Sequence, residues 1–462
     1  MSQDQSAIWD RAHRALTIGL VLTVSMTAFE ALAVATALPA VVRDLGGLHL
    51  YGWAFSGFML TNLLSIALAG RAVDRRGVTL PFGLGSAVFV AGLIGAGSAT
   101  AMWMVVASRI GQGLGAGAIS AVAYAAVARG YATELRPRMV ALLSSAWVVP
   151  GLIGPAIAGA VTDHWHWRWV FLGLVPLTAA SAALAVLGLR RVAAAQPPES
   201  QPDTTAAALA LAIGVGALLA APQTGSRAIA VVCFGAGALL TLPALRRLLP
   251  AGTLRARAGL PATIAAVGLL SAAFFGAEAF LPLTLTTLRG QSTVTSGLAL
   301  TAATLTWTAG AWIQARLAPR HSRRTLIVVG LLAMFIGLAG LLAVLDPAVP
   351  IAWAIATWGL TGLGIGIAYS TTAVVVLEAA PHGGEGAASA ALQLANVLGV
   401  AVGTGAGGAI VAMAQATGRS IGHAIALVDG VTLIATALAI VAARRIPARP
   451  STVASPEQRL SS

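Results

Sequence analysis

Long apolar segments with few charged residues recur along the whole chain, and they constrain its fold more than any other feature. Two examples run from Leu80 to Ala101 and from Met139 to Val161. A helix rises about 1.5 Å per residue, so about 20 such residues cross a bilayer, whereas a barrel strand needs about 10. We count fourteen candidate spans, and 58% of the residues are hydrophobic while 9% are charged. The sequence therefore predicts an all-α polytopic membrane protein.

The basic residues predict the orientation of the chain. All 28 are arginine; 22 fall in the N-terminal segment, alternate loops and the C-terminal tail, and five fall in the opposite loops. Cytoplasmic loops are enriched in basic residues, so we expect both termini in the cytoplasm. The net charge of +13 arises from arginines at helix ends, such as Arg190 and Arg191, which indicates membrane anchoring rather than a nucleic-acid partner.

The spans divide into six, two and six. We expect an N-terminal six-helix bundle over residues 1–190, a linker with two inserted helices over 191–258, a C-terminal six-helix bundle over 259–445 and a disordered cytoplasmic tail over 446–462. The two inserted runs, Ala206 to Pro222 and Ala228 to Leu245, are short. They either cross the membrane twice or form an interfacial hairpin, and we favour two crossings.

An internal repeat relates the two bundles. Glu30 and Glu278 lie 248 residues apart, each within an apolar segment that contains a Leu-Pro pair, and the glycine string 111–117 matches 360–366 at an offset of 249. Two homologous bundles enclose a central cavity in many secondary transporters. A carboxylate within a span costs about 2.5 to 3.5 kcal/mol at the helix centre, which usually marks a functional site.

A loop between the second and third spans carries a specific pattern, Gly70-Arg71-Ala-Val-Asp74-Arg75-Arg76-Gly77. In this loop the chain resembles the major facilitator superfamily, and more narrowly its 14-helix drug:proton antiporters. The resemblance implies two six-helix bundles with two extra central helices. It also implies that Asp74 forms a latch that holds the halves together on the cytoplasmic side. In the second half Pro319 replaces the acid, so we expect an asymmetric latch.

The fourth span carries Arg109-Ile-Gly-Gln112-Gly, similar to the family motif that places an arginine inside the membrane. Counting residues from the helix ends puts Arg109, Glu30 and Glu278 at roughly 10, 13 and 15 Å of depth, so all three can meet. We expect proton coupling at Glu30, Arg109 and Glu278, with Asp429 as a further acid. The alternative is that Arg109 pairs permanently with one glutamate to lock the packing. Trp358 stands at the duplicate position of Arg109, so only one half carries the cation.

The fifth span resembles the antiporter-associated signature through Pro150, Gly151, Gly154, Pro155 and Gly159. Proline removes backbone hydrogen bonds and glycine allows close helix contact, so this span predicts a pliable seam. The alternative is ordinary tight packing.

The remaining candidate residues concern the cavity and the outer loop. Amides are few within the spans, so we expect a cavity that suits apolar ligands, lined by Asn62, Gln112, Tyr124, Trp147, Trp307, Tyr369, Gln393 and Asn396. Residues 163–169 hold two histidines and three tryptophans, which we interpret as an interfacial belt rather than a metal site. We expect no cofactor.

These features together predict a function. We expect a proton-coupled exporter of lipophilic small molecules, cations among them, of the multidrug-efflux type. It would work as a monomer in a bacterial inner membrane. The alternatives are export of an endogenous lipid or secreted metabolite, and a proton-coupled importing symporter. We expect no enzyme activity, because the chain lacks a nucleophile–base or metal-ligand pattern.

Overall fold

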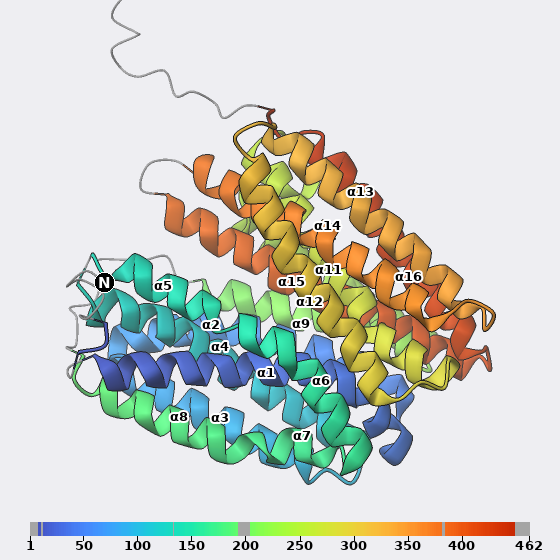
Figure 1. The fold of residues 1–462 in the computed structure, drawn as a ribbon, viewed down its shortest axis with the longest axis horizontal. Helices are drawn as coiled ribbons and strands as arrows, with labels where there is room; N and C mark the ends of the chain where they lie inside the picture. The colour runs from blue at the N-terminus through green and yellow to red at the C-terminus, as the bar shows by residue number, and fades with distance from the viewer. Residues whose placement is uncertain (1–7, 11–12, 133, 193–203, 381–383, 449–462) are drawn as a thin grey trace, which may run out of the picture.

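The computed structural model describes residues 8–10, 13–132, 134–192, 204–380 and 384–448. Its regular elements are helices, arranged in two bundles that lie at an angle to each other (Figure 1). Within the described residues, thirteen helices are long and apolar enough to cross a membrane. The fourteenth expected span is α12 (Thr293–Leu317), which has 25 residues but is rich in threonine.

The N-terminal bundle contains six spans in eight helices. They are α1 (Arg14–Leu45), α2 (Trp53–Arg76), α3 (Thr79–Gly97), α4 (Met102–Gly130), α5 (Arg136–Ser145) with α6 (Val148–His164), and α7 (Arg168–Leu172) with α8 (Leu174–Leu189). A short 3-10 turn, η2 (Leu48–Leu50), precedes α2. The single helix expected over 139–161 is therefore broken between α5 and α6.

That break has a local cause. Pro150 has no N–H to donate to the carbonyl of Ala146, four residues earlier. The Ser25 hydroxyl of α1 donates to this carbonyl instead, at 3.1 Å. The proline therefore creates both the break and a polar contact with the neighbouring helix.

The C-terminal bundle repeats the arrangement. It contains α11 (Leu260–Leu283), α12, α13 (Arg323–Leu342), α14 (Ile351–Glu378), α15 (Glu385–Ala416) and α16 (Ile421–Ala443), and a π-turn over Thr284–Leu288 extends α11. Between the bundles, α9 (Thr205–Ala220) and α10 (Arg227–Leu248) pack on each other, and α9 rests on α2 and α15. Both are long and apolar enough to cross a membrane, counting α9 with its following turn. Residues 193–203 of the expected linker and residues 449–462 of the expected tail lie outside the described residues.

The bundles converge at one end and diverge at the other (Figure 1). We call the converging end the closed end; there α1 and α6 finish and α12 begins. Contacts between the halves gather here: the backbone of Gly52 packs on Gly408, and Asp163 of α6 accepts hydrogen bonds from the first backbone N–H groups of α12. The other end, where α2, α4 and α14 finish, we call the open end.

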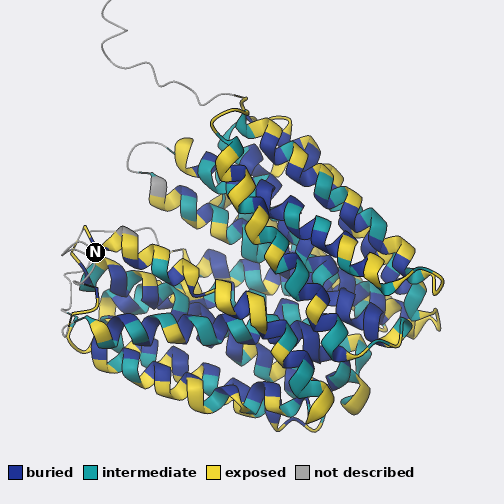
Figure 2. Cartoon of the chain, in the orientation of Figure 1, coloured by how far each residue is buried: buried dark blue, intermediate teal, exposed yellow. Residues whose placement is uncertain are grey.

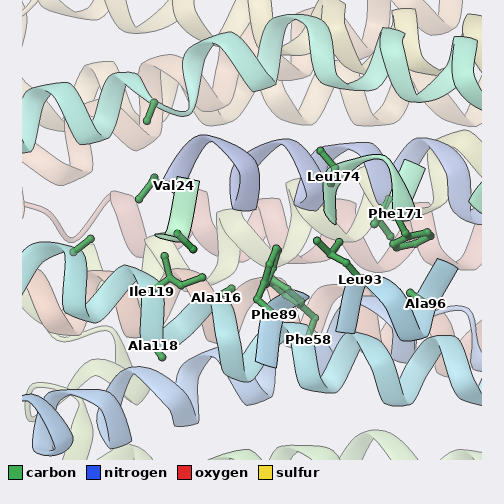
Figure 3. Packing of buried hydrophobic residues seen from close by; sticks show 14 of the residues in the cluster. Val24, Phe58, Phe89, Leu93, Ala96, Ala116, Ala118, Ile119, Phe171 and Leu174 are labelled. Atoms are coloured by element: carbon green, nitrogen blue, oxygen red, sulfur yellow. The ribbon is translucent and has the colours of Figure 1, made fainter. Parts of the chain in front are cut away.

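Burial follows the bundles. Buried residues fill the interior of each bundle and exposed ones lie along the outside (Figure 2). In the N-terminal core, Phe58 and Phe89 approach α4 close to Ala116 and Ile119 (Figure 3). A side chain at Gly115 would meet the backbone and Cβ of Phe89, so glycine is what lets α3 and α4 pack this closely.

Candidate functional site

A buried ion pair lies inside the N-terminal bundle. Arg109 of α4 donates through Nη1 to Oε1 of Glu30 on α1. The arginine is 2% exposed and the glutamate 0%. The structure thus brings together two residues that the sequence places at similar depth.

Arg109 has further partners besides Glu30. Its Nε donates to the carbonyl of Ala54 at 3.0 Å, and Nη1 donates to Oε1 of Gln112 at 2.6 Å. Its guanidinium carbon lies 4.2 Å from the centre of the Phe58 ring, a cation–π contact. The arginine is therefore held by α2 and α4 independently of Glu30.

Two atoms at this site lack a partner. Glu30 Oε2 and Gln112 Nε2 are buried, and among the described residues neither has a hydrogen-bond partner. An unsatisfied buried polar group costs about 1 to 3 kcal/mol and is usually found where a proton, a water or a conformational change supplies the partner. Gln112 lies in this cluster rather than in open space, which differs from its expected place in the cavity lining.

In the C-terminal bundle, the carboxyl groups of Glu278 and Asp429 have no polar partner among the described residues. Glu278 of α11 is partly buried and Asp429 of α16 is 6% exposed. Within the described part of the chain, no hydrogen bond or ion pair involves either carboxyl group. In this conformation Arg109 is therefore committed to Glu30, and Glu278 remains available for another charge.

An aromatic cluster joins the helix of Glu278, α11, to α12 and α14. Phe274, four residues before it, stacks on Trp358 at 4.8 Å between ring centres and meets Trp307 edge-on at 5.3 Å. Trp307 in turn lies 5.9 Å from Tyr369. The position that duplicates Arg109 thus holds an apolar ring in the second half.

The other expected cavity residues differ in their exposure. Tyr124, Trp147 and Gln393 are exposed and Asn62 is intermediate. The Asn396 amide oxygen accepts from the Ser271 hydroxyl at 2.8 Å, which ties α15 to α11. The structure therefore gives Asn396 a packing contact inside the C-terminal half.

The proline–glycine motif of α6 forms a seam with α12. A side chain at Gly159 would meet the backbone of Thr293 at 2.7 Å and that of Val294 at 2.8 Å, and one at Gly151 would meet Thr304 at 2.8 Å. The motif thus lies on the boundary between the halves, where close contact must form and separate if the halves move.

Residues 70–76 of the basic motif, expected in a loop, form the last turns of α2 and are tied to α4. The Asp74 carboxylate accepts a hydrogen bond from Arg129 at 2.8 Å. Arg129 was not among the residues predicted from the sequence. In the second half Arg323 donates to Glu378 at 2.8 Å, with the same separation of 55 residues and the charges exchanged. Each pair joins two helices within its own bundle. In this conformation Asp74 therefore does not form a latch across the halves, and that latch stays a prediction.

The outer-loop residues make specific polar contacts. Arg168 and Trp167 both donate to the Asp44 carboxylate at 3.0 Å, which ties α7 to the end of α1. Asp163 accepts from the backbone N–H groups of Thr293 at 3.2 Å and Val294 at 2.9 Å. These acids are engaged in helix-end contacts.

Two six-helix bundles that converge at one end and diverge at the other, with a buried ion pair inside the first, define the class: a multi-pass membrane transporter, not an enzyme. The family model described as Major Facilitator Superfamily matches residues 18–404 and 266–461. The chain belongs to the major facilitator superfamily.

Known relatives agree with this membership. An uncharacterized MFS-type transporter of Mycobacterium tuberculosis is 33% identical over 181 residues, which cover 39% of this chain and 26% of the relative. Multidrug transporter protein MdtP of Bacillus subtilis is 27% identical over 148 residues, covering 32% of this chain and 27% of the relative. The matches thus span about a quarter of these relatives' lengths.

The fold also matches solved structures. The crystal structure of a D-xylose-proton symporter superposes with a TM-score of 0.65 at 14% identity, covering 95% of this chain and 98% of the other. At this identity the likeness concerns the fold alone.

Proposed function

We propose that this transporter is a proton-coupled exporter of lipophilic small molecules, cations among them, working by alternating access. The observation that carries the proposal is the buried Glu30–Arg109 pair. Burial favours the neutral carboxyl and the neighbouring guanidinium favours the ionised one, so opposing influences meet on one group. Because Arg109 keeps Ala54, Gln112 and Phe58 as partners, it retains two hydrogen-bond acceptors and a ring contact when Glu30 takes up a proton.

We infer the orientation from the arginines. Basic loops gather at the open end, so the open end faces the cytoplasm and the chain is inward-facing. Both termini are then cytoplasmic, and we place the protein in a bacterial inner membrane as a monomer. The name of the Bacillus subtilis relative, a multidrug transporter, supports export.

The substrate class rests on the C-terminal half. The cluster of Phe274, Trp307 and Tyr369 offers aromatic surface. Glu278, on the helix of Phe274, offers a carboxyl group that has no partner among the described residues. Aromatic faces and a carboxylate together suit a lipophilic cation. Sugars and peptides would need many more polar partners than these residues supply.

Proton movement in reconstituted vesicles tests the proposal. Purified protein is placed in vesicles with an internal pH dye, and lipophilic cations and neutral compounds are added in turn. We expect substrate and protons to move in opposite directions. Movement in the same direction would establish an importing symporter, and transport of lipid without any drug-driven proton flux would establish the lipid exporter; either result contradicts the proposal.

A further inference from the structure

Tyr51 links the two halves at the closed end. It lies between η2 and α2, is 0% exposed, and its hydroxyl donates to the carbonyl of Ala279 on α11 at 2.8 Å. Its ring packs against Phe280 at 5.3 Å between ring centres. Tyr51 and Ala279 belong to different halves, so this contact must break when the closed end opens.

The next residue fixes this corner against the C-terminal half. A side chain at Gly52 would lie 3.0 Å from the carbonyl oxygen of Thr404 and closer still to Gly408, both on α15. The backbone of the corner therefore packs directly on the backbone of α15. Because the corner is packed this closely, a small displacement of the start of α2 would move Tyr51 relative to its contacts in the C-terminal half.

On the N-terminal side the corner leads to the buried ion pair. The N–H of Ala54 donates to the Tyr51 carbonyl at 3.2 Å, and the Ala54 carbonyl accepts from Arg109 Nε at 3.0 Å. The first turn of α2 thus connects Tyr51 to the cation that neutralises Glu30. Arg109 can shift toward or away from Glu30 only by moving against this turn.

On the C-terminal side the contact falls next to Glu278. Ala279 directly follows Glu278, and Pro282 has no N–H to donate to the Glu278 carbonyl. A π-turn over Thr284–Leu288 follows. Helix α11 therefore lacks a regular hydrogen bond where Tyr51 holds it, and such points are where membrane helices bend.

We propose that Tyr51 is a positioning residue that couples the Glu30–Arg109 site to closure of the closed end, which is the outer end of the protein in the inferred orientation. The hydroxyl holds α11 beside Glu278 while the outer end is closed. Protonation of Glu30 weakens its electrostatic attraction for Arg109. The first turn of α2, which is bonded to Arg109 through the Ala54 carbonyl, transmits this change to the hydrogen bond between Tyr51 and Ala279. The proposal rests on the alternating-access part of the proposed function and not on the direction of transport.

Spin-label distances between the outer ends test it. Spin labels are attached through His49→Cys and Ala348→Cys, both at exposed positions, in a Cys233→Ser background. Tyr51→Phe removes the hydroxyl and keeps the ring. We expect about a threefold rise in the outward-open population relative to the closed one, the factor typical of one hydrogen bond between membrane helices.

Tyr131→Phe is the matched control. The Tyr131 hydroxyl is bonded to Thr17 at 2.7 Å, is buried, and lies within one half. It should leave the distances unchanged. Equal effects of the two variants would indicate general loosening and would overturn the proposal, as would no effect of Tyr51→Phe.

The link to Glu30 is tested by a double-mutant cycle. Glu30→Gln mimics the protonated carboxyl and should change the outward-open population in the Tyr51 background. In the Tyr51→Phe background this change should fall by about half or more. Additive effects, or no effect of Glu30→Gln on the distances, would overturn the coupling. No substrate or gradient is present, so the result stands whether the protein proves an exporter or a symporter.

Discussion

At the scale of single residues, the chain separates two kinds of acid. Glu30 is paired with a cation that has other partners, whereas Glu278 and Asp429 have no partner in the described part of the chain. When the paired acid takes up a proton, its cation loses the counter-charge and is held only by its remaining neutral partners. An unpaired acid can receive either a proton or a positive substrate. Two predictions follow from this difference.

Glu30→Gln should abolish uphill export while substrate binding persists. With one pH unit as the driving force, the wild type should accumulate a singly exchanged cation about tenfold, because one pH unit is worth about 1.4 kcal/mol. The variant should only equilibrate. Everted vesicles measure this, with the exposed Glu134→Gln as control. Accumulation by the Glu30 variant would refute its role.

Glu278→Gln distinguishes a second proton from a substrate counter-charge. If Glu278 carries a second proton, export of a cation is electrogenic and 100 mV contributes about 2.3 kcal/mol, or about 50-fold. The variant should lose this voltage response. If Glu278 instead neutralises the substrate, the variant should lose cations and still export neutral compounds. Imposing voltage and pH gradient separately resolves the two, and unchanged behaviour in both would exclude Glu278.

At the scale of helices, α6 and α12 form the tightest boundary between the halves. Pro155 and Gly297 are in contact across it, and Gly159 lies against Val294. This contact exists at the closed end only while the halves are together. The glycines therefore do more than allow α6 and α12 to pack closely. They also allow the conformation in which the outer end is closed.

Gly159→Val should favour the outward-open state. Overpacking costs about 1 kcal/mol or more, and opening the closed end relieves it, so the equilibrium should shift about fivefold or more. The spin-label pair described above measures the shift. Gly111→Val is the control, because nothing lies within 4 Å of a side chain there. A loss of stability without a shift in distance would assign the seam to packing alone.

At the scale of the whole molecule, the two halves carry the same intrabundle clamp with opposite charges. Asp74–Arg129 and Arg323–Glu378 both join the junction of the second and third helices of a half to the end of its fourth helix. The repeat thus preserves the pair while exchanging its members. A charge-exchanged clamp is demonstrably compatible with this fold.

Exchanging the charges of the first clamp should test what the latch does. Asp74→Asn should impair cycling more than folding, and raise cysteine accessibility from the cytoplasmic side. The double variant Asp74→Arg with Arg129→Asp should restore transport if the pair acts within its bundle, since partly exposed pairs contribute about 0 to 1 kcal/mol in either polarity. A double variant as impaired as Asp74→Asn would indicate that Asp74 itself meets the other half.

The sequence by itself determined the class of protein and the pattern of its membrane spans. Hydropathy is a local property, so twenty consecutive apolar residues specify a membrane helix whatever surrounds them. Counting from helix ends was also enough to bring Glu30 and Arg109 to one level, because a helix has a fixed rise. The internal offset of 248 or 249 marked the duplicated halves in the same way.

Only the tertiary structure decided the partners that are backbone atoms or lie on distant helices. The carbonyls of Ala54, Ala146 and Ala279 have no signature in the sequence, yet they receive Arg109, Ser25 and Tyr51. Arg129 was indistinguishable from an anchoring arginine until α4 was placed beside α2. The conformation, closed at one end, likewise depends on contacts between the two halves. Tyr51 and Ala279 are 228 residues apart in the sequence, and no local pattern encodes a contact over that separation.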